Sequence, residues 1–125
     1  MKTIETKGAP EAIGPYTQGK IVAPYVFTSG QIALTPEGEF LGGTIEEQTE
    51  RVLANIRAIV EAAGSSLDQV IKTTVYLNDI SEFEAMNAVY EKAFGNHAPA
   101  RTTVEVSKLP KNAKVEIEAV AQLPS

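Results

Sequence analysis

The chain has 125 residues, of which 43% are hydrophobic and 22% charged, and this balance predicts a single globular domain over residues 1–125. It contains no cysteine and one histidine, His97, which excludes disulfides, thiol nucleophiles and any metal site built from thiolates or several histidines. A net charge of −5 without a basic run argues against a nucleic-acid partner. No apolar segment is long enough to span a membrane, so we expect a cytoplasmic protein.

The first part of the sequence predicts short strands separated by turns. Strands are expected over residues 3–5, 19–23 and 25–34, and a rigid Gly-Pro turn before the second strand carries the ring of Tyr16. Gly30 interrupts the third of these strands. A glycine there indicates either a simple bulge or a place where the backbone approaches another group closely, and the sequence leaves both readings open.

A helix is predicted after the glycine-rich loop of residues 35–43. Thr44 can cap its start, and Glu47, three residues later, completes a capping box. Gly64 supplies the left-handed residue that ends it. Apolar residues recur between these limits at helical spacing, namely Ile45, Val52, Ile56, Ile59, Val60 and Ala63.

The middle of the chain predicts a strand and then a second helix. The strand covers residues 70–77, whose alternation places Val70 and Ile71 on opposite faces. Ser81 and Glu84 have the spacing of a second capping box. The apolar stripe of this second helix includes Asn87, an amide that either ties down a backbone carbonyl or faces a polar pocket.

Two strands close the chain and carry the residues that point most directly to chemistry. Arg101 opens the first of them, and Glu116 and Glu118 lie among apolar residues in the second. Arginine offers a planar fork of donors that matches a carboxylate, so these residues suggest a pocket that needs fixed charges. The alternative is an edge-strand arginine with two acids that face solvent.

The element order predicts an α+β or mixed α/β fold, and of these we expect α+β, with a single mixed sheet and two helices on one face. The last two strands, residues 101–106 and 114–122, are joined by a segment longer than a tight hairpin needs, so we do not expect them to be neighbours. The other face of such a sheet would be bare, and oligomerisation would cover its apolar residues.

The sequence resembles the RidA/YjgF family over nearly its whole length, in order and in spacing. The segments that carry the resemblance are AIGPYTQG, FTSGQIALTPEGE, VLANIRAIVEAAGSSLDQVIKTTVYLND, MNAVYEKAF and PARTTVEVSKLPKNAKVEIEAVA. The resemblance implies a chorismate-mutase-like fold, a homotrimer whose sheets line a central barrel, and clefts between subunits. It also implies an enzyme without a cofactor or metal that hydrolyses reactive 2-enamino and 2-imino acids, such as 2-aminoacrylate and 2-iminobutanoate, to 2-keto acids and ammonia.

The resemblance also implies a set of site residues. Arg101 of the PAR motif would hold the substrate carboxylate, and Glu116 would position the attacking water. The remaining matches to the family's site are Tyr16 as a further catalytic group and Ser29, Gly30, Asn87 and Thr103 as substrate-binding residues. Thr103 stands where many members have cysteine, and the loop before Arg101 is short and contains His97, which we read as a surface residue.

Two other functions are compatible with the same residues. A trimer that binds small 2-keto acids without turning them over would need the same arginine. A third reading, an endoribonuclease or translation inhibitor, has been attached to some relatives, but the acidic balance and the lack of an aromatic and basic platform argue against it here.

Overall fold

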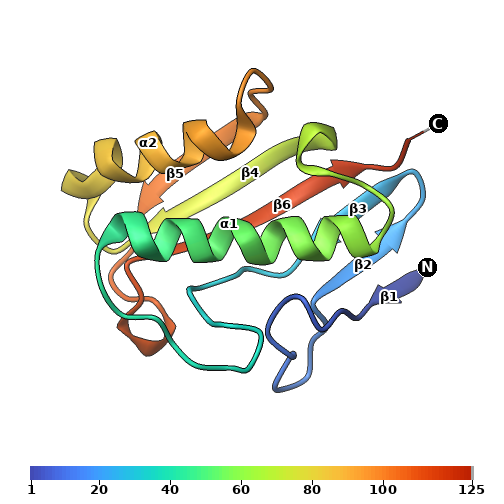
Figure 1. Ribbon diagram of the computed structural model, residues 1–125, viewed down its shortest axis with the longest axis horizontal. Helices are drawn as coiled ribbons and strands as arrows, with labels where there is room; N and C mark the ends of the chain where they lie inside the picture. The colour runs from blue at the N-terminus through green and yellow to red at the C-terminus, as the bar shows by residue number, and fades with distance from the viewer. Residues whose placement is uncertain (125) are drawn as a thin grey trace.

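The computed structural model describes residues 1–124. It contains one six-stranded sheet and two long helices that pack against the same face of that sheet (Figure 1). The strands are β1 (Lys2–Ile4), β2 (Gly19–Val22), β3 (Tyr25–Thr28), β4 (Val70–Leu77), β5 (Ala100–Glu105) and β6 (Val115–Gln122). The helices are α1 (Ile45–Ala62) and α2 (Phe83–Phe94). The α+β prediction of a single mixed sheet with both helices on one side is therefore confirmed.

The strands lie in the order β1-β2-β3-β6-β4-β5. All neighbours are antiparallel except β4 and β5, which run parallel because α2 carries the chain back between them. Strands β5 and β6 are separated by β4, as the length of their connection predicted. Strand β5 is consequently an edge strand, and this places Arg101 at one side of the sheet.

Helix α1 begins and ends where the sequence indicated. The Thr44 hydroxyl accepts a hydrogen bond from the Glu47 amide, and the Glu47 carboxylate accepts one from the Thr44 amide, so both halves of the capping box are present. Gly64 follows the helix with φ near +91°. Buried side chains of α1 pack on the central strands and form the main core, which includes Val52, Ile56, Ile59, Val75 and Ile117.

The start of α2 differs from its prediction. Ser81 and Glu84 do not form a capping box, because a 3-10 turn over Ile80–Glu82 precedes the helix. The Asp79 carboxylate accepts hydrogen bonds from both the amide and the hydroxyl of Ser81 and caps that turn instead. The acid one residue before a short helical turn competes successfully with the serine for the role of cap.

The start of β4 also differs from simple alternation. The pairing of β4 with β6 shifts between Val70 and Lys72, which is a β-bulge at Ile71. Val70 is therefore fully buried on the helix side together with Thr73, Val75 and Leu77, while Ile71 is exposed.

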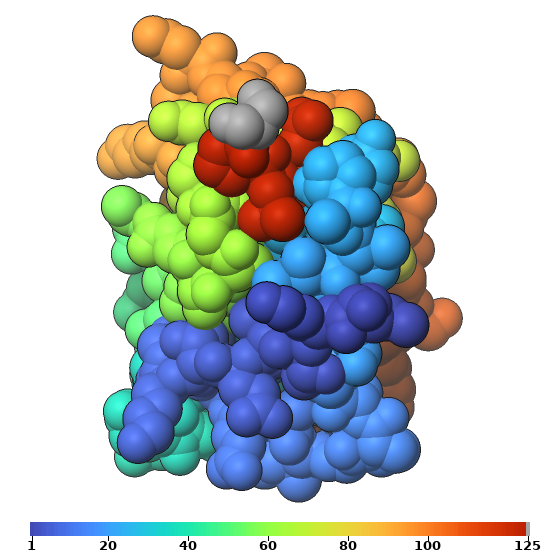
Figure 2. All heavy atoms as spheres, turned by 90° about the vertical axis from the view of Figure 1, so that its right-hand side faces the viewer, coloured from blue at the N-terminus to red at the C-terminus, as the bar shows by residue number. Residues whose placement is uncertain are grey.

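The face of the sheet away from the helices is uncovered. Figure 2 shows the two layers from the side, with α1 in green on the left and the hairpin of β2 and β3 in blue on the right. Four large apolar side chains of the uncovered face are between 39% and 45% exposed, namely Val22, Tyr25, Phe27 and Val104. Among residues 1–124, neither helix has the length and apolar character needed to cross a membrane.

Candidate functional site

Arg101 lies on β5 and points to the helix side of the sheet, beneath α2. Its Nη1 donates a hydrogen bond of 2.7 Å to Oδ1 of Asn87. Its guanidinium carbon lies 4.7 Å from the ring centroid of Tyr90 and 5.3 Å from that of Phe83. The Tyr90 ring is itself held by a 2.6 Å hydrogen bond between its hydroxyl and that of Thr73. Two aromatic faces and an amide therefore fix the guanidinium plane.

The contact with Arg101 decides between the two readings of Asn87. The recorded partner of the Asn87 amide oxygen is the guanidinium, so this side chain faces a polar site instead of tying down a backbone carbonyl. Within residues 1–124, the other guanidinium N–H groups of Arg101 have no protein acceptor. They remain available to an anion.

Gly30 and Glu116 form a second group, and a break in the β3–β6 pairing creates it. Strand β3 ends at Thr28, six residues earlier than predicted, and pairing with β6 resumes only at Gln31, which exchanges two backbone hydrogen bonds with Ile117. The bulged residues between are anchored by Ser29, whose amide donates to the Gln18 carbonyl at 2.8 Å. The Ser29 hydroxyl donates to the Thr17 carbonyl at 2.5 Å.

The bulge brings the chain against Glu116. A Cβ atom built on Gly30 would overlap Oε2 of the Glu116 carboxylate. Of the two readings of this glycine, both apply: the strand bulges, and the backbone approaches the Glu116 carboxylate so closely that a side chain at this position would displace it.

Glu116 is partly buried, and its environment favours the protonated form. Burial chiefly, and then the charge of Glu118, raise the pKa of the Glu116 carboxyl above its usual range. A carboxyl group with a raised pKa holds a proton more tightly than usual, which suits a group that must accept a proton and return it.

The Arg101 group and the Glu116 group lie on opposite faces of one chain's sheet. Arg101 is opposite the buried Thr73 in the β4–β5 register, whereas Glu116 is opposite Tyr76 in the β4–β6 register. Thr73 and Tyr76 are three positions apart on β4, so their side chains point to opposite faces. The prediction of one pocket containing both charges therefore does not hold within a single chain.

The other predicted site residues, Tyr16 and Thr103, lie apart from each other in the structure. Tyr16 is 54% exposed and lines a hollow of about 730 Å³ beside the N-terminal segment, apart from Arg101 and Asn87. Its neighbour Thr17 contacts Ser29, so its loop is tied to the Gly30 bulge. The hydroxyl oxygen of Thr103 is buried and has no hydrogen-bond partner among residues 1–124.

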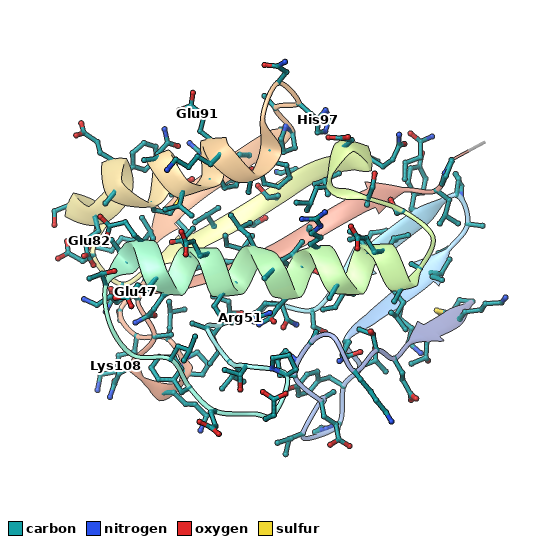
Figure 3. All side chains as sticks on the ribbon, in the orientation of Figure 1. Glu47, Arg51, Glu82, Glu91, His97 and Lys108 are labelled. Carbon is teal, nitrogen blue, oxygen red and sulfur yellow. The ribbon has the colours of Figure 1, made fainter. Side chains whose placement is uncertain are left out.

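Two residues near these groups were not assigned a role from the sequence. His97 was read as a surface residue, but it is half-buried, and its Nε2 lies 2.6 Å from the carbonyl oxygen of Val70 at the bulge of β4 (Figure 3). Tyr76 lies directly opposite Glu116. Strand register reveals the position of Tyr76, and the position of His97 depends on a contact 27 residues away in the chain. Among residues 1–124, no three His, Asp or Glu side chains are grouped to hold a metal ion.

Comparisons with known proteins agree with the sequence resemblance. Residues 6–123 match the model of the family described as endoribonuclease L-PSP. The chain belongs to this family, RidA/YjgF. A RutC family protein of Pyrococcus abyssi is 51% identical over 96% of this chain and 95% of its own length.

Other relatives have more specific names. The 2-iminobutanoate/2-iminopropanoate deaminase of Salmonella typhimurium is 46% identical over 96% of both chains. The crystal structure of Escherichia coli TdcF with bound serine is similar with a TM-score of 0.94 and 44% identity, over 99% of this chain and 100% of that one. This member of the RidA/YjgF family is thus similar over 96% of its length to a named deaminase and over 99% to a protein whose structure contains bound serine.

Proposed function

We propose that this protein hydrolyses small 2-imino acids and their enamine tautomers to 2-keto acids and ammonia, with 2-iminobutanoate and 2-iminopropanoate as representative substrates. The observation that carries the proposal is the guanidinium of Arg101, fixed by Asn87 and two rings with donors left for an anion. The identity to a named 2-iminobutanoate/2-iminopropanoate deaminase supports the same chemistry.

Each step of the reaction has a candidate group. Arg101 forms a two-pronged ion pair with the substrate carboxylate and so fixes the adjacent C=N carbon. Glu116 accepts a proton from a water molecule as the water oxygen bonds to that carbon. The same carboxyl returns that proton to nitrogen, which gives a carbinolamine. It then takes the proton of the new hydroxyl group and passes it to the amino nitrogen as the C–N bond breaks, so that ammonia leaves and the hydroxyl oxygen becomes the keto oxygen. An imine carbon is electrophilic enough to need no covalent nucleophile, and the proposal invokes no cofactor.

The remaining predicted residues take supporting roles. Gly30 and Ser29 present backbone groups to the ligand beside Glu116. Thr103 lies on the same strand as Arg101, two residues further along, and binds the substrate beside it. Tyr16 closes the pocket or exchanges a proton from its exposed loop.

The active assembly that we propose is a homotrimer. Arg101 and Glu116 face opposite sides of one sheet, so one small substrate can reach both only if they come from different copies. The uncovered sheet face with its four large apolar side chains provides the surface on which copies pack around a central barrel. We expect this trimer to act in the cytoplasm.

Binding without turnover is the second candidate, and one observation favours it: the similar TdcF structure contains bound serine. Serine has a carboxylate that Arg101 could hold, but it has no imine. An endoribonuclease activity is named in the description of the family model, but the net charge of −5 argues against it.

The deciding experiment supplies 2-iminobutanoate from threonine with a threonine dehydratase and measures the release of 2-ketobutanoate and ammonia by the purified protein. We expect accelerated release by the wild type and none by Arg101→Ala, because the substrate is no longer bound. Glu116→Gln should lower kcat by about 10²–10⁴-fold, the usual contribution of a general base, with little change in KM.

Three results would contradict the proposed hydrolysis or the role of Arg101 in it. No acceleration by the wild type, together with saturable binding of 2-ketobutanoate that Arg101→Ala abolishes, would identify a binding protein. Normal turnover by Arg101→Ala would remove this residue from the proposed role. Cleavage of RNA by the wild type but not by Arg101→Ala would favour the endoribonuclease reading.

A further inference from the structure

Gln18 joins two segments of the chain that lie apart in the sequence. Its side chain is 5% exposed. The Gln18 Oε1 atom accepts a hydrogen bond of 2.7 Å from the Thr6 amide, and Nε2 donates one of 3.0 Å to the Thr6 carbonyl. Nε2 also donates to the carbonyl oxygens of Pro10 at 2.9 Å and Ala9 at 3.3 Å. One buried amide thus holds the backbone of residues 6–10 against the loop that precedes β2.

An amide is the side-chain group that satisfies these partners. Glutamine offers two N–H donors and a carbonyl oxygen, and here the oxygen meets an N–H group while the donors meet carbonyl oxygens. The contacts with Ala9 and Pro10 are buried. A carboxylate at position 18 would turn an oxygen toward these carbonyl oxygens, and an apolar side chain would leave them without a donor. Either change would weaken the hold on residues 6–10.

The backbone of the same residue holds the bulge at residues 29–30. The Ser29 amide donates to the Gln18 carbonyl at 2.8 Å, and the Ser29 hydroxyl donates to the Thr17 carbonyl. In the part of the chain that the structure describes, these are the hydrogen bonds recorded for the bulge. Pairing with β6 resumes only at Gln31. The position of the bulge therefore depends on residues 17 and 18, and their position depends on the Gln18 side chain.

We propose that Gln18 is a positioning residue for Glu116. Its buried amide anchors its own backbone to residues 6–10, and that backbone holds the bulge beside the Glu116 carboxylate. The contact between the two is close, since a Cβ atom built on Gly30 would displace this carboxylate. The inference rests on the proposed function, in which Glu116 takes a proton from water and returns it. A shifted bulge would misplace this group and leave the guanidinium that binds the substrate in place.

The test compares two buried glutamines. Gln48 of α1 is 2% exposed, and its side chain accepts from the Lys114 amide at 2.9 Å and donates to the Gly43 carbonyl at 3.4 Å, with no contact to the bulge. Gln18→Met and Gln48→Met each replace a buried amide with an apolar side chain of similar length. Both should lower the melting temperature, because backbone groups lose their partners. Only Gln18→Met should release the bulge.

Hydrogen exchange follows the bulge without any activity. In Gln18→Met, the Ser29 amide should exchange faster because the carbonyl that accepts its hydrogen is no longer anchored. The Gln31 amide, which donates to the Ile117 carbonyl of β6, is the reference within the same molecule. The ratio of the two exchange rates should rise about 2–10-fold, the factor that corresponds to one hydrogen bond. In Gln48→Met this ratio should equal that of the wild type.

The hydrolysis assay then tests the effect on the reaction. Gln18→Met should lower kcat by about 10–10²-fold, because a misplacement of about 1 Å is enough for the larger loss. KM should change little, since Arg101 is untouched, and Gln48→Met should keep the wild-type kcat. If Gln18→Met does not fold, Gln18→Glu takes its place with Gln48→Glu as control. Gln18→Glu keeps the shape and the oxygen that faces the Thr6 amide, but it loses both donors.

The outcomes separate this inference from the proposed function. If the wild type hydrolyses no imine, the proposed function fails, and the exchange ratio still decides whether Gln18 holds the bulge. An exchange ratio that stays at the wild-type value in the Gln18 variant overturns the inference. So does an equal fall in kcat for the Gln18 and Gln48 variants, because lost stability would then explain both. A rise in KM as large as the fall in kcat would also overturn it.

Discussion

Gly30 is the residue at which the space around Glu116 is most restricted. Its backbone lies outside the left-handed region, and it is exposed, so alanine is compatible with the local fold. The added methyl group would overlap the Glu116 carboxylate and displace it. A displacement of about 1 Å is enough to lower a rate by about 10²-fold. We therefore expect Gly30→Ala to lower kcat for 2-iminobutanoate by about this factor, with little change in thermal stability.

Gly42→Ala is the matched control for this prediction, because no heavy atom lies within 4 Å of a Cβ built there. It should have wild-type kcat and stability. A Gly30→Ala protein that is as active as Gly42→Ala would mean that the Glu116 carboxylate can move without consequence.

The raised pKa of Glu116 also determines how the stability of the folded protein depends on pH. Burial chiefly, and then Glu118, raise its pKa in the folded protein, so the folded chain binds this proton more tightly than the unfolded chain. The resulting stability is fully present below the unfolded pKa of about 4.3 and is lost as pH rises through the folded value. Glutamine does not titrate. The melting temperature of Glu116→Gln relative to wild type should therefore increase between about pH 4 and about pH 8.

Calorimetry at several pH values measures this difference directly. Glu105→Gln provides a control, because this exposed carboxylate lies on the edge strand away from the group around Glu116. A melting-temperature difference for Glu116→Gln that stays constant with pH would contradict the burial and repulsion described for Glu116.

At the scale of residues, the sequence singled out Gly30, Asn87, Arg101 and Glu116 as candidates but could not show which of them lie together. Residue type alone indicates that an arginine at a strand entrance or a glycine within a strand is unusual. Which face each side chain occupies depends on register and on the bulge at residues 29–30, and these are set by pairing with distant strands.

At the scale of elements, the loop that leads into β5 is held by one side chain. The 2.6 Å contact between His97 Nε2 and the Val70 carbonyl joins this loop to the buried start of β4, which is the strand that pairs with β5 (Figure 3). His97→Ala leaves that buried carbonyl without its partner, at a cost of about 1–3 kcal/mol. We expect a corresponding loss in the free energy of unfolding and faster hydrogen exchange of the β5 amides.

The adjacent Asn96 is exposed, and Asn96→Ala is the control for the same loop. His97→Gln, which retains an N–H donor, should recover part of the lost stability. If His97→Ala unfolds at the same denaturant concentration as Asn96→Ala, the contact with Val70 does not stabilise the protein.

The elements themselves show where local sequence signals are reliable. Helix α1 was predicted from its capping box and apolar spacing because both signals lie within one turn of the chain. The bulge at Ile71 was not predicted, because the alternation along residues 70–77 is uninterrupted in the sequence. The shift arises from pairing with β6. His97 was read as a surface residue for the same reason: its partner is 27 residues away.

At the scale of the whole molecule, we expect the uncovered sheet face to determine the oligomeric state of the protein in solution. Phe27 is 43% exposed on this face, so an aspartate there would not disturb the core of the single chain. It would place a charge in the centre of the surface that we propose copies share. We expect a mass about three times the chain's 13.4 kDa for the wild type and a smaller one for Phe27→Asp, measured by light scattering.

Circular dichroism and the exchange of core amides verify that Phe27→Asp remains folded. An Ala54→Asp variant, at an exposed position of α1 on the other side of the sheet, tests whether an added negative charge alone has the same effect. A wild type that has the mass of a single chain would contradict the assembly and, with it, a site shared between copies.

The opposite orientation of Arg101 and Glu116 leads to the most stringent prediction. If each site takes Arg101 from one copy and Glu116 from another, Arg101→Ala and Glu116→Gln are each inactive alone but complement each other when co-expressed in one trimer. In random mixing at equal amounts, about a quarter of the sites combine the intact arginine of one variant with the intact glutamate of the other. We expect hydrolysis of 2-iminobutanoate by the mixture at about that fraction of the wild-type rate. A site within one chain would give none, because every chain then carries a defect, and co-expression of Glu116→Gln with the double variant should be inactive under either arrangement.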